Sequence, residues 1–131
     1  MPQLNFGIYD NGADTDATFG KLSISGRDEC GFRPYFLMTS AVVGCSTGVL
    51  RQELAARGVE YDDIKVVADV TRNPAMANRI EQIDLRFLIK PKGEISTKVI
   101  GEAMEAMRNT SSMIQTVRES IKVECDFSVV Q

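Results

Sequence analysis

The stretch from Pro34 to Gly58 constrains the fold of this chain most, because its ends and its apolar content predict one long helix. Proline is favoured at the first helical position and glycine just beyond the last one. The middle of the stretch, residues 40–50, nevertheless carries two glycines, three valines, two serines and a threonine, all weak helix formers. We therefore expect packing, rather than intrinsic propensity, to stabilise this helix.

The small residues of this helix form a stripe. Ala41, Gly44, Cys45 and Gly48 are three or four positions apart, which puts them on one side, where another backbone can approach closely. This spacing explains Cys45 as one more small residue in a tight contact. Its place in mid-helix also keeps it from a helix N-terminus, where the pKa of a thiol falls. From spacing alone we expect a packing role for Cys45.

Strand-like and helical patterns flank this helix. Ser96 is placed to cap a second helix with an apolar stripe, and polar residues 109–112 separate it from a short third helix ending near Glu119. Phe19 is out of step with its apolar neighbours in the second strand, so Gly20 is expected to mark a bulge. Apolar or alternating runs predict strands at residues 3–9, 17–25, 62–72, 79–90 and 121–130, with a turn at 10–16.

The order of these elements predicts an α+β fold. Two strand pairs are separated by the long helix, and a pair of helices precedes the last strand, so we expect antiparallel strands rather than a doubly wound parallel sheet. The chain has 131 residues, which suits one core and is short for two. We expect a single domain over residues 1–131.

Composition excludes several classes of function. The chain has no histidine, which removes Ser–His and Cys–His nucleophile pairs and histidine-ligated zinc. The net charge is −3 without a Lys/Arg cluster, so neither nucleic acid nor a membrane surface is an expected partner. Asp10, Asp14 and Asp16 lack the spacing of a calcium-binding loop, and we expect neither metal nor cofactor.

The three cysteines have different surroundings in the sequence. None belongs to a C-x-x-C pair, and no secretory signal precedes them, which favours the reducing cytoplasm. Cys30 lies among acidic residues, which disfavour a thiolate. Cys125 is predicted as a small buried hydrophobe on the apolar face of the last strand, together with Ile121, Val123, Phe127 and Val129.

Two segments resemble the OsmC/Ohr family of osmotically inducible and organic hydroperoxide resistance proteins. In "RPYFLMTSAVVGCSTGVLRQELAARGVEYDDIKV", Pro34 follows Gly31 by three positions and Cys45 follows Pro34 by eleven, as in the family's central helix. In "EAMEAMRNTSSMIQTVRESIKV", the residues Met113, Thr116 and Val117 are similar to the tail of the family's Cys-Pro-Val-x-x-Thr-Leu motif. The resemblance covers residues 31 to 125 and implies the OsmC-like fold.

The resemblance also implies a chemistry and an assembly. Family members of known activity are thiol peroxidases and intertwined homodimers, with active sites at the subunit interface. Cys45 occupies the position of the attacking cysteine. Ser111 occupies that of the resolving cysteine, and Ser112 stands where the family has proline. In the family, a glutamate and an N-terminal arginine hold the attacking thiolate. The glutamate aligns with Tyr35 or Phe36 of this chain, and no arginine occurs before Arg27 to take the place of the N-terminal arginine. Arg33 and Arg27 lie near the start of the central helix in the sequence, and we expect one of them to substitute for the family's arginine.

Two hypotheses for the function follow. In the first, the protein is a one-cysteine thiol peroxidase or redox protein, in which Cys45 attacks an organic hydroperoxide and an external thiol reduces the product. In the second, it has kept the OsmC fold and the dimer without peroxidase activity, and binds a small molecule or a partner. The presence of Cys45 favours the first hypothesis, and the serine at position 111 favours the second.

Overall fold

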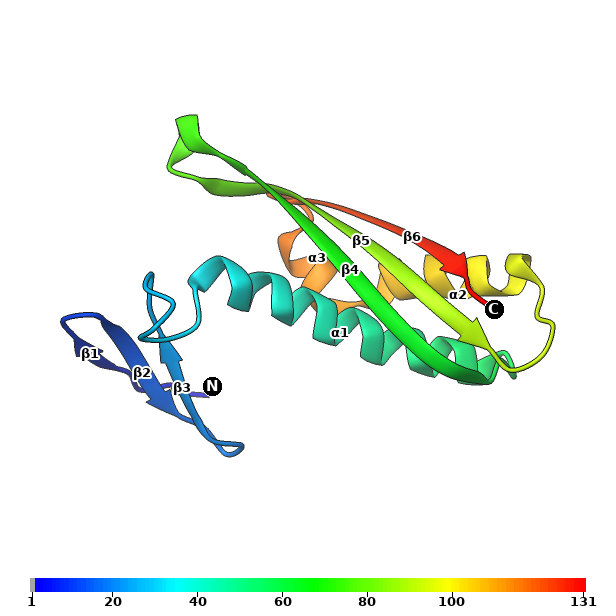
Figure 1. The fold of residues 1–131 in the computed structure, drawn as a ribbon, viewed down its shortest axis with the longest axis horizontal. Helices are drawn as coiled ribbons and strands as arrows, with labels where there is room; N and C mark the ends of the chain where they lie inside the picture. Colours follow the sequence, from blue (N-terminus) through cyan, green and yellow to red (C-terminus); the bar gives the residue numbers. More distant parts are fainter. Residues whose placement is uncertain (1) are drawn as a thin grey trace. The chain divides into compact units, whose positions relative to one another are not determined.

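The computed structural model describes residues 2–131, which form two compact units (Figure 1). The first unit ends at Ser40 and the second comprises Ala41–Gln131. The helix α1, Pro34–Ala56, begins in the first unit and continues in the second. Among the described residues there are three α-helices and two three-stranded sheets, which confirms the predicted α+β class.

The sheet of the first unit corrects the sequence analysis. It is antiparallel, in the order β1–β2–β3, with strands Gly7–Tyr9, Gly12–Asp16 and Lys21–Ile24. The predicted turn over residues 10–16 is therefore wrong, because its larger part is the central strand β2. Hydrogen bonds on both edges of β2 override the low strand propensity of glycine and aspartate.

One residue of this sheet and one loop beside it explain its geometry. Gly12 is needed because a Cβ there would lie 2.1 Å from the backbone oxygen of Ile24. Phe19 is not a strand residue, since Ala17 and Gly20 exchange two backbone hydrogen bonds of 3.0 and 3.1 Å and close a tight hairpin loop around it. The side chain of Phe19 is fully exposed, and Gly20 ends this loop instead of forming the expected bulge.

Helix α1 has the ends that its sequence predicts. It begins at Pro34, and after Ala56 the chain turns through Gly58 in the left-handed conformation, with φ 70°. The N–H of Val59 bonds to the oxygen of Leu54 at 2.9 Å, which completes the usual glycine C-cap. The most deeply buried side chains of the helix are spaced four apart: Val42, Ser46, Leu50 and Leu54.

The sheet of the second unit has the order β4–β5–β6, with strands Tyr61–Asn73, Arg79–Pro91 and Lys122–Val129. Strands β4 and β5 form a long antiparallel hairpin, closed by a 3₁₀ turn at Pro74–Met76. Strand β6 is parallel to β5, so the expectation of antiparallel strands throughout is wrong at this one pairing. The helical pair between the two strands carries the chain back to the end of the sheet where β5 starts, as a parallel pairing requires.

Helices α2, Thr97–Thr110, and α3, Ser112–Val117, pack with α1 on one face of this sheet (Figure 1). The Ser96 hydroxyl accepts the N–H of Lys98 at 3.2 Å, which confirms the predicted cap of α2. No helix within residues 2–131 has the length and hydropathy that a membrane span needs. The core joins α1, β5, α2 and α3 through Leu50, Leu54, Ile83, Leu85, Phe87, Ile89, Ile100, Ala103, Met104, Met107 and Ile114.

Candidate functional site

Cys45 lies where α1 meets the junction between α2 and α3. The junction is made by Ser111, whose N–H bonds to the oxygen of Met107 at 2.8 Å while its extended backbone, with ψ 115°, takes the chain out of α2. The Ser111 hydroxyl then accepts the N–H of Ile114 at 3.4 Å and caps α3. This break directs the side chains of Ser111 and Ser112 at Cys45.

Two hydroxyl groups contact the sulfur of Cys45. The Oγ of Ser111 donates to Sγ at 3.4 Å, and the Oγ of Ser112 lies 3.5 Å from Sγ, where either atom can be the donor. Ser111 is fully buried, Ser112 is exposed, and Cys45 itself is partly exposed. The sulfur therefore has a buried donor on one side and remains open to solvent.

These contacts lower the pKa of the Cys45 thiol to about 7. The largest cause is the hydrogen bond from Ser111, followed by the contact with Ser112 and the backbone N–H of Met113, while partial burial opposes them. Each of these donors stabilises the thiolate more than the thiol. Roughly half of Cys45 is ionised at pH 7, and the thiolate is the nucleophilic form.

The groups that lower the pKa of the Cys45 thiol lie outside α1, the helix to which Cys45 belongs. Cys45 lies in the middle of α1, where the backbone N–H groups are bonded within the helix and do not act on its sulfur. The backbone N–H groups of Ser112 and Met113, at the start of α3, act on the sulfur instead. Sequence reasoning missed this effect because these residues lie more than sixty positions from Cys45.

The predicted supporting arginine is engaged elsewhere. In the first unit, Nε of Arg33 donates to Oδ1 of Asp28 at 2.6 Å, and this bond raises the pKa of the guanidinium. Arg27 pairs with Glu29 at 2.8 Å in the same unit. Within residues 2–131, the groups that hydrogen-bond Cys45 are hydroxyl and backbone N–H, with no charged side chain. A role for Arg33 at Cys45 stays a prediction.

Among residues 2–131, no hydroxyl donates to the sulfur of either of the other two cysteines as Ser111 does to that of Cys45. Cys125 lies on β6 and packs against the core, but it is partly and not fully buried, unlike the prediction, and desolvation raises the pKa of its thiol to about 11. Cys30 is partly exposed in the loop before α1, where its N–H bonds to the oxygen of Arg27 at 3.0 Å. None of the three cysteines forms a disulfide.

In this histidine-free chain, cysteines and carboxylates are the side chains that could hold a metal ion. Within residues 2–131, no three Cys, Asp or Glu side chains lie close enough together to hold a metal ion. Asp14, one of the clustered acidic residues near the N-terminus, pairs with Lys21 at 3.6 Å across β2 and β3.

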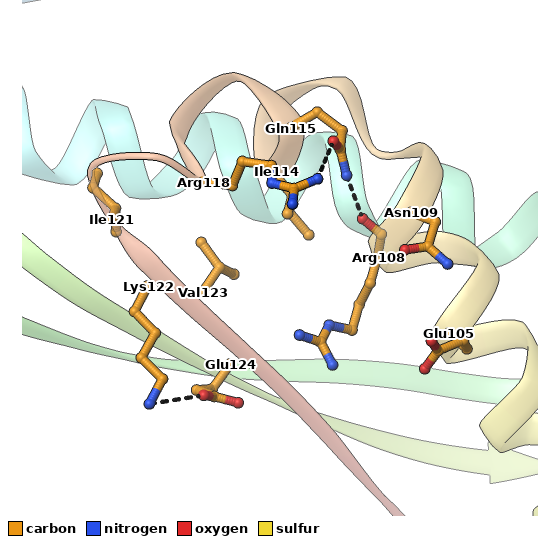
Figure 2. Close-up of a pocket in the computed structure, with 10 residues that line it drawn as sticks. All are labelled: Glu105, Arg108, Asn109, Ile114, Gln115, Arg118, Ile121, Lys122, Val123 and Glu124. Carbon is orange, nitrogen blue, oxygen red and sulfur yellow. Dashed lines mark hydrogen bonds and ion pairs between the residues drawn. The ribbon is translucent and has the colours of Figure 1, made fainter.

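A polar hollow of about 370 Å³ lies between α2, α3 and β6 (Figure 2). Gln115 spans its upper part, donating to the backbone oxygen of Arg108 at 3.2 Å and accepting from Arg118 at 3.0 Å. On β6, Lys122 pairs with Glu124 at 3.2 Å. Cys45 does not line this hollow, so the two features are separate.

Comparison with known proteins agrees with this fold. The family model described as OsmC-like protein matches residues 26–126, which is most of the chain. No curated protein sequence matches the chain significantly.

Solved structures share the fold at low sequence identity. An OsmC-like protein from Mycoplasma pneumoniae aligns with a TM-score of 0.85 and 14% identity, over 100% of this chain and 98% of that one. An organic hydroperoxide resistance protein OsmC from Legionella pneumophila aligns with a TM-score of 0.73 and 12% identity, over 98% of each chain. The organic hydroperoxide resistance protein OhrB of Bacillus subtilis aligns with a TM-score of 0.66 and 12% identity, again over 98% of each chain.

Proposed function

This chain belongs to the OsmC-like protein family, and on that premise we propose that it is a thiol-dependent redox protein that reduces organic hydroperoxides through Cys45. The observation that carries the proposal is the hydrogen bonding of Cys45 by Ser111 and Ser112, which lowers the pKa of the thiol to about 7. Two structural neighbours are named as organic hydroperoxide resistance proteins, which supports the substrate class.

The first chemical step is attack by the Cys45 thiolate on the outer oxygen of the hydroperoxide. A sulfur–oxygen bond forms and the oxygen–oxygen bond breaks. The proton of the attacked oxygen passes to the alkoxide, which leaves as the alcohol, and the sulfenate that remains takes a proton from water. The sulfur is oxidised by two electrons to a sulfenic acid. The Ser111 and Ser112 hydroxyls are placed to donate to the thiolate before attack and to the sulfenate oxygen after it.

The second step requires a thiol from outside the chain. Ser111, at the position of the family's resolving cysteine, contacts the sulfur but forms no disulfide. An external thiol therefore attacks the sulfenic sulfur, forms a mixed disulfide with Cys45 and releases water. A second thiol then attacks the outer sulfur of the mixed disulfide, and the bond to Cys45 breaks to release the Cys45 thiolate. Small thiols are abundant in the reducing cytoplasm, where we place this activity.

The same α1 surface supports the proposal that the protein is a homodimer. Ala41 and Gly44 are exposed in the single chain, and a Cβ built on Gly44 or Gly48 meets nothing within 4 Å. These small residues leave room for the backbone of a second copy. Sedimentation at micromolar concentration is expected to give the mass of a dimer, and a stable folded monomer would contradict the proposal.

A peroxidase assay tests the proposed chemistry. With cumene hydroperoxide as substrate and dithiothreitol as reductant, the parent protein should consume the hydroperoxide and Cys45→Ser should not. Cys30→Ser is the matched control, since Cys30 lies in a loop of the first unit, and it should keep the parent rate. Equal consumption by the parent and Cys45→Ser would contradict the proposal.

One observation favours a second candidate, a non-catalytic OsmC-fold protein that binds a small molecule or a partner. Ser111 gives the chain no thiol next to Cys45, and no charged side chain hydrogen-bonds the sulfur within residues 2–131. If the parent protein fails to consume hydroperoxide with any of several small thiols as reductant, this candidate replaces the first.

A further inference from the structure

Ser46 is a buried polar residue next to Cys45 that the proposed chemistry does not use. Its side chain has 0% exposure and belongs to the core-facing row of α1, between Val42 and Leu50. A buried hydroxyl without a partner is costly, so its hydrogen bond matters. Within residues 2–131, the recorded partner of the Ser46 hydroxyl is Ser111, with the two Oγ atoms 3.4 Å apart.

The donors and acceptors around Ser111 fix the direction of this bond. A serine hydroxyl has one hydrogen to donate and two lone pairs to accept with. The hydrogen of Ser111 goes to the sulfur of Cys45, and one lone pair accepts the N–H of Ile114 at 3.4 Å. The remaining lone pair faces Ser46, so Ser46 is the donor whenever Cys45 is a thiolate.

The opposite direction would leave the sulfur with less hydrogen bonding. If Ser111 donated to Ser46, the thiolate would lose its buried donor, and the hydrogen of Ser46 would turn to a carbonyl of its own helix, as that of Thr47 does at Val43. The loss of a donor to an anion is unfavourable, so the order Ser46 to Ser111 to Cys45 is the one that keeps the thiolate hydrogen-bonded.

We propose that Ser46 is a positioning residue, whose hydroxyl orients Ser111 so that Ser111 presents its hydrogen to the sulfur of Cys45. The inference rests on the proposed function only in taking the thiolate as the working form. A hydroxyl that accepts a hydrogen bond becomes a stronger donor, so Ser46 also strengthens the bond from Ser111 to the sulfur. The distance of 3.4 Å between the two Oγ atoms is long for a bond between hydroxyls, which limits the size of the effect.

A titration of Cys45 tests the proposal without any peroxidase assay. In a Cys30→Ser, Cys125→Ala background, only Cys45 titrates as a thiol, and its thiolate is followed by ultraviolet absorbance. Ser46→Ala is expected to raise the pKa of Cys45 by about half a unit, which is about a threefold fall in the thiolate-to-thiol ratio. Ser46→Thr keeps the hydroxyl and should restore the parent pKa.

Thr47→Val is the matched control. It removes a hydroxyl from the next residue of α1, but this hydroxyl bonds to the oxygen of Val43 at 2.9 Å and not to Ser111. We expect the pKa of Cys45 to stay at the parent value in this variant. Circular dichroism of each variant checks that the fold is intact before titration.

A second pair of variants separates positioning from a general structural effect. If Ser46 acts through Ser111, then Ser46→Ala should add no further shift in a Ser111→Ala background. An unchanged pKa in Ser46→Ala, or the same rise with and without Ser111, would overturn the inference. If the parent protein shows no peroxidase activity, the proposed function is contradicted, but the titration of Cys45 still tests the role of Ser46.

Discussion

Cys45 and Cys125 are two cysteines in different regions of the second unit, and the groups around each sulfur shift the pKa of its thiol in opposite directions. Both residues are partly exposed, but the thiol of Cys125 packs against the core and is the more desolvated of the two. Hydroxyl and backbone N–H donors lower the pKa of Cys45 to about 7, whereas burial against the core raises that of Cys125 to about 11. The comparison teaches that two things together decide which thiol is nucleophilic: the donors that a distant segment brings to one sulfur, and the desolvation of the other.

The largest expected effect comes from giving Cys45 a thiol partner. In Ser111→Cys, the introduced sulfur replaces an oxygen 3.4 Å from Sγ, and a disulfide of roughly 2.05 Å needs only small side-chain rotations. Treatment with hydroperoxide should bridge the two residues completely, as seen by peptide mapping without reductant. The double variant Cys45→Ser, Ser111→Cys is the control and should form no bridge. A bridge from the new thiol to Cys125 instead would reverse the comparison.

A smaller effect is expected for the two native thiols in exchange with an aromatic disulfide at pH 7. The pKa values of about 7 and about 11 give Cys45 several thousandfold more thiolate than Cys125. The lower basicity of Cys45 makes each thiolate roughly sixtyfold less nucleophilic, at a Brønsted slope of about 0.45. Cys45 should therefore exchange about a hundredfold faster, as measured by mass spectrometry of quenched peptides. Equal rates would show that the two environments do not differ.

The smallest effect concerns stability, and its sign differs between the two cysteines. The pKa of Cys45 is lowered on folding. The contribution of Cys45 to the free energy of unfolding therefore grows as pH rises from about 7 to the ordinary thiol pKa of roughly 8.5. The pKa of Cys125 is raised, so its contribution is complete below roughly 8.5 and is lost as pH rises toward about 11. Urea unfolding of the parent and of Cys45→Ala and Cys125→Ala across this range measures both slopes. Slopes of the same sign would contradict the comparison.

The sequence predicts the parts of the fold that depend on local signals. Pro34 and Gly58 bracket α1, and Ser96 caps α2, because caps act within a few residues of their own backbone. Strand β2, Gly12–Asp16, was mistaken for a turn because its hydrogen-bonding neighbours, and not its composition, make it a strand. The parallel pairing of β6 depends in the same way on where two helices return the chain.

The candidate site likewise has one residue that the sequence predicts and others that only the folded structure reveals. The resemblance to the family placed Ser111 opposite Cys45, and the hydroxyl of Ser111 does contact the sulfur. The contributions of Ser112 and Ser46 had no signal in the sequence, since a serine beside a cysteine is ordinary and the contacts span 67 and 65 positions. Only the packing of the α2–α3 junction against α1 brings these residues together.

The most direct test of the account is to trap the first product of oxidation. The protein is exposed to one equivalent of cumene hydroperoxide with dimedone, which captures sulfenic acids, and the labelled peptides are followed over time. We predict that the Cys45 peptide is labelled first, and that Ser111→Ala slows its labelling at pH 7. Labelling of Cys30 or Cys125 before Cys45, or an unlabelled Cys45 after the hydroperoxide is consumed, would contradict the account.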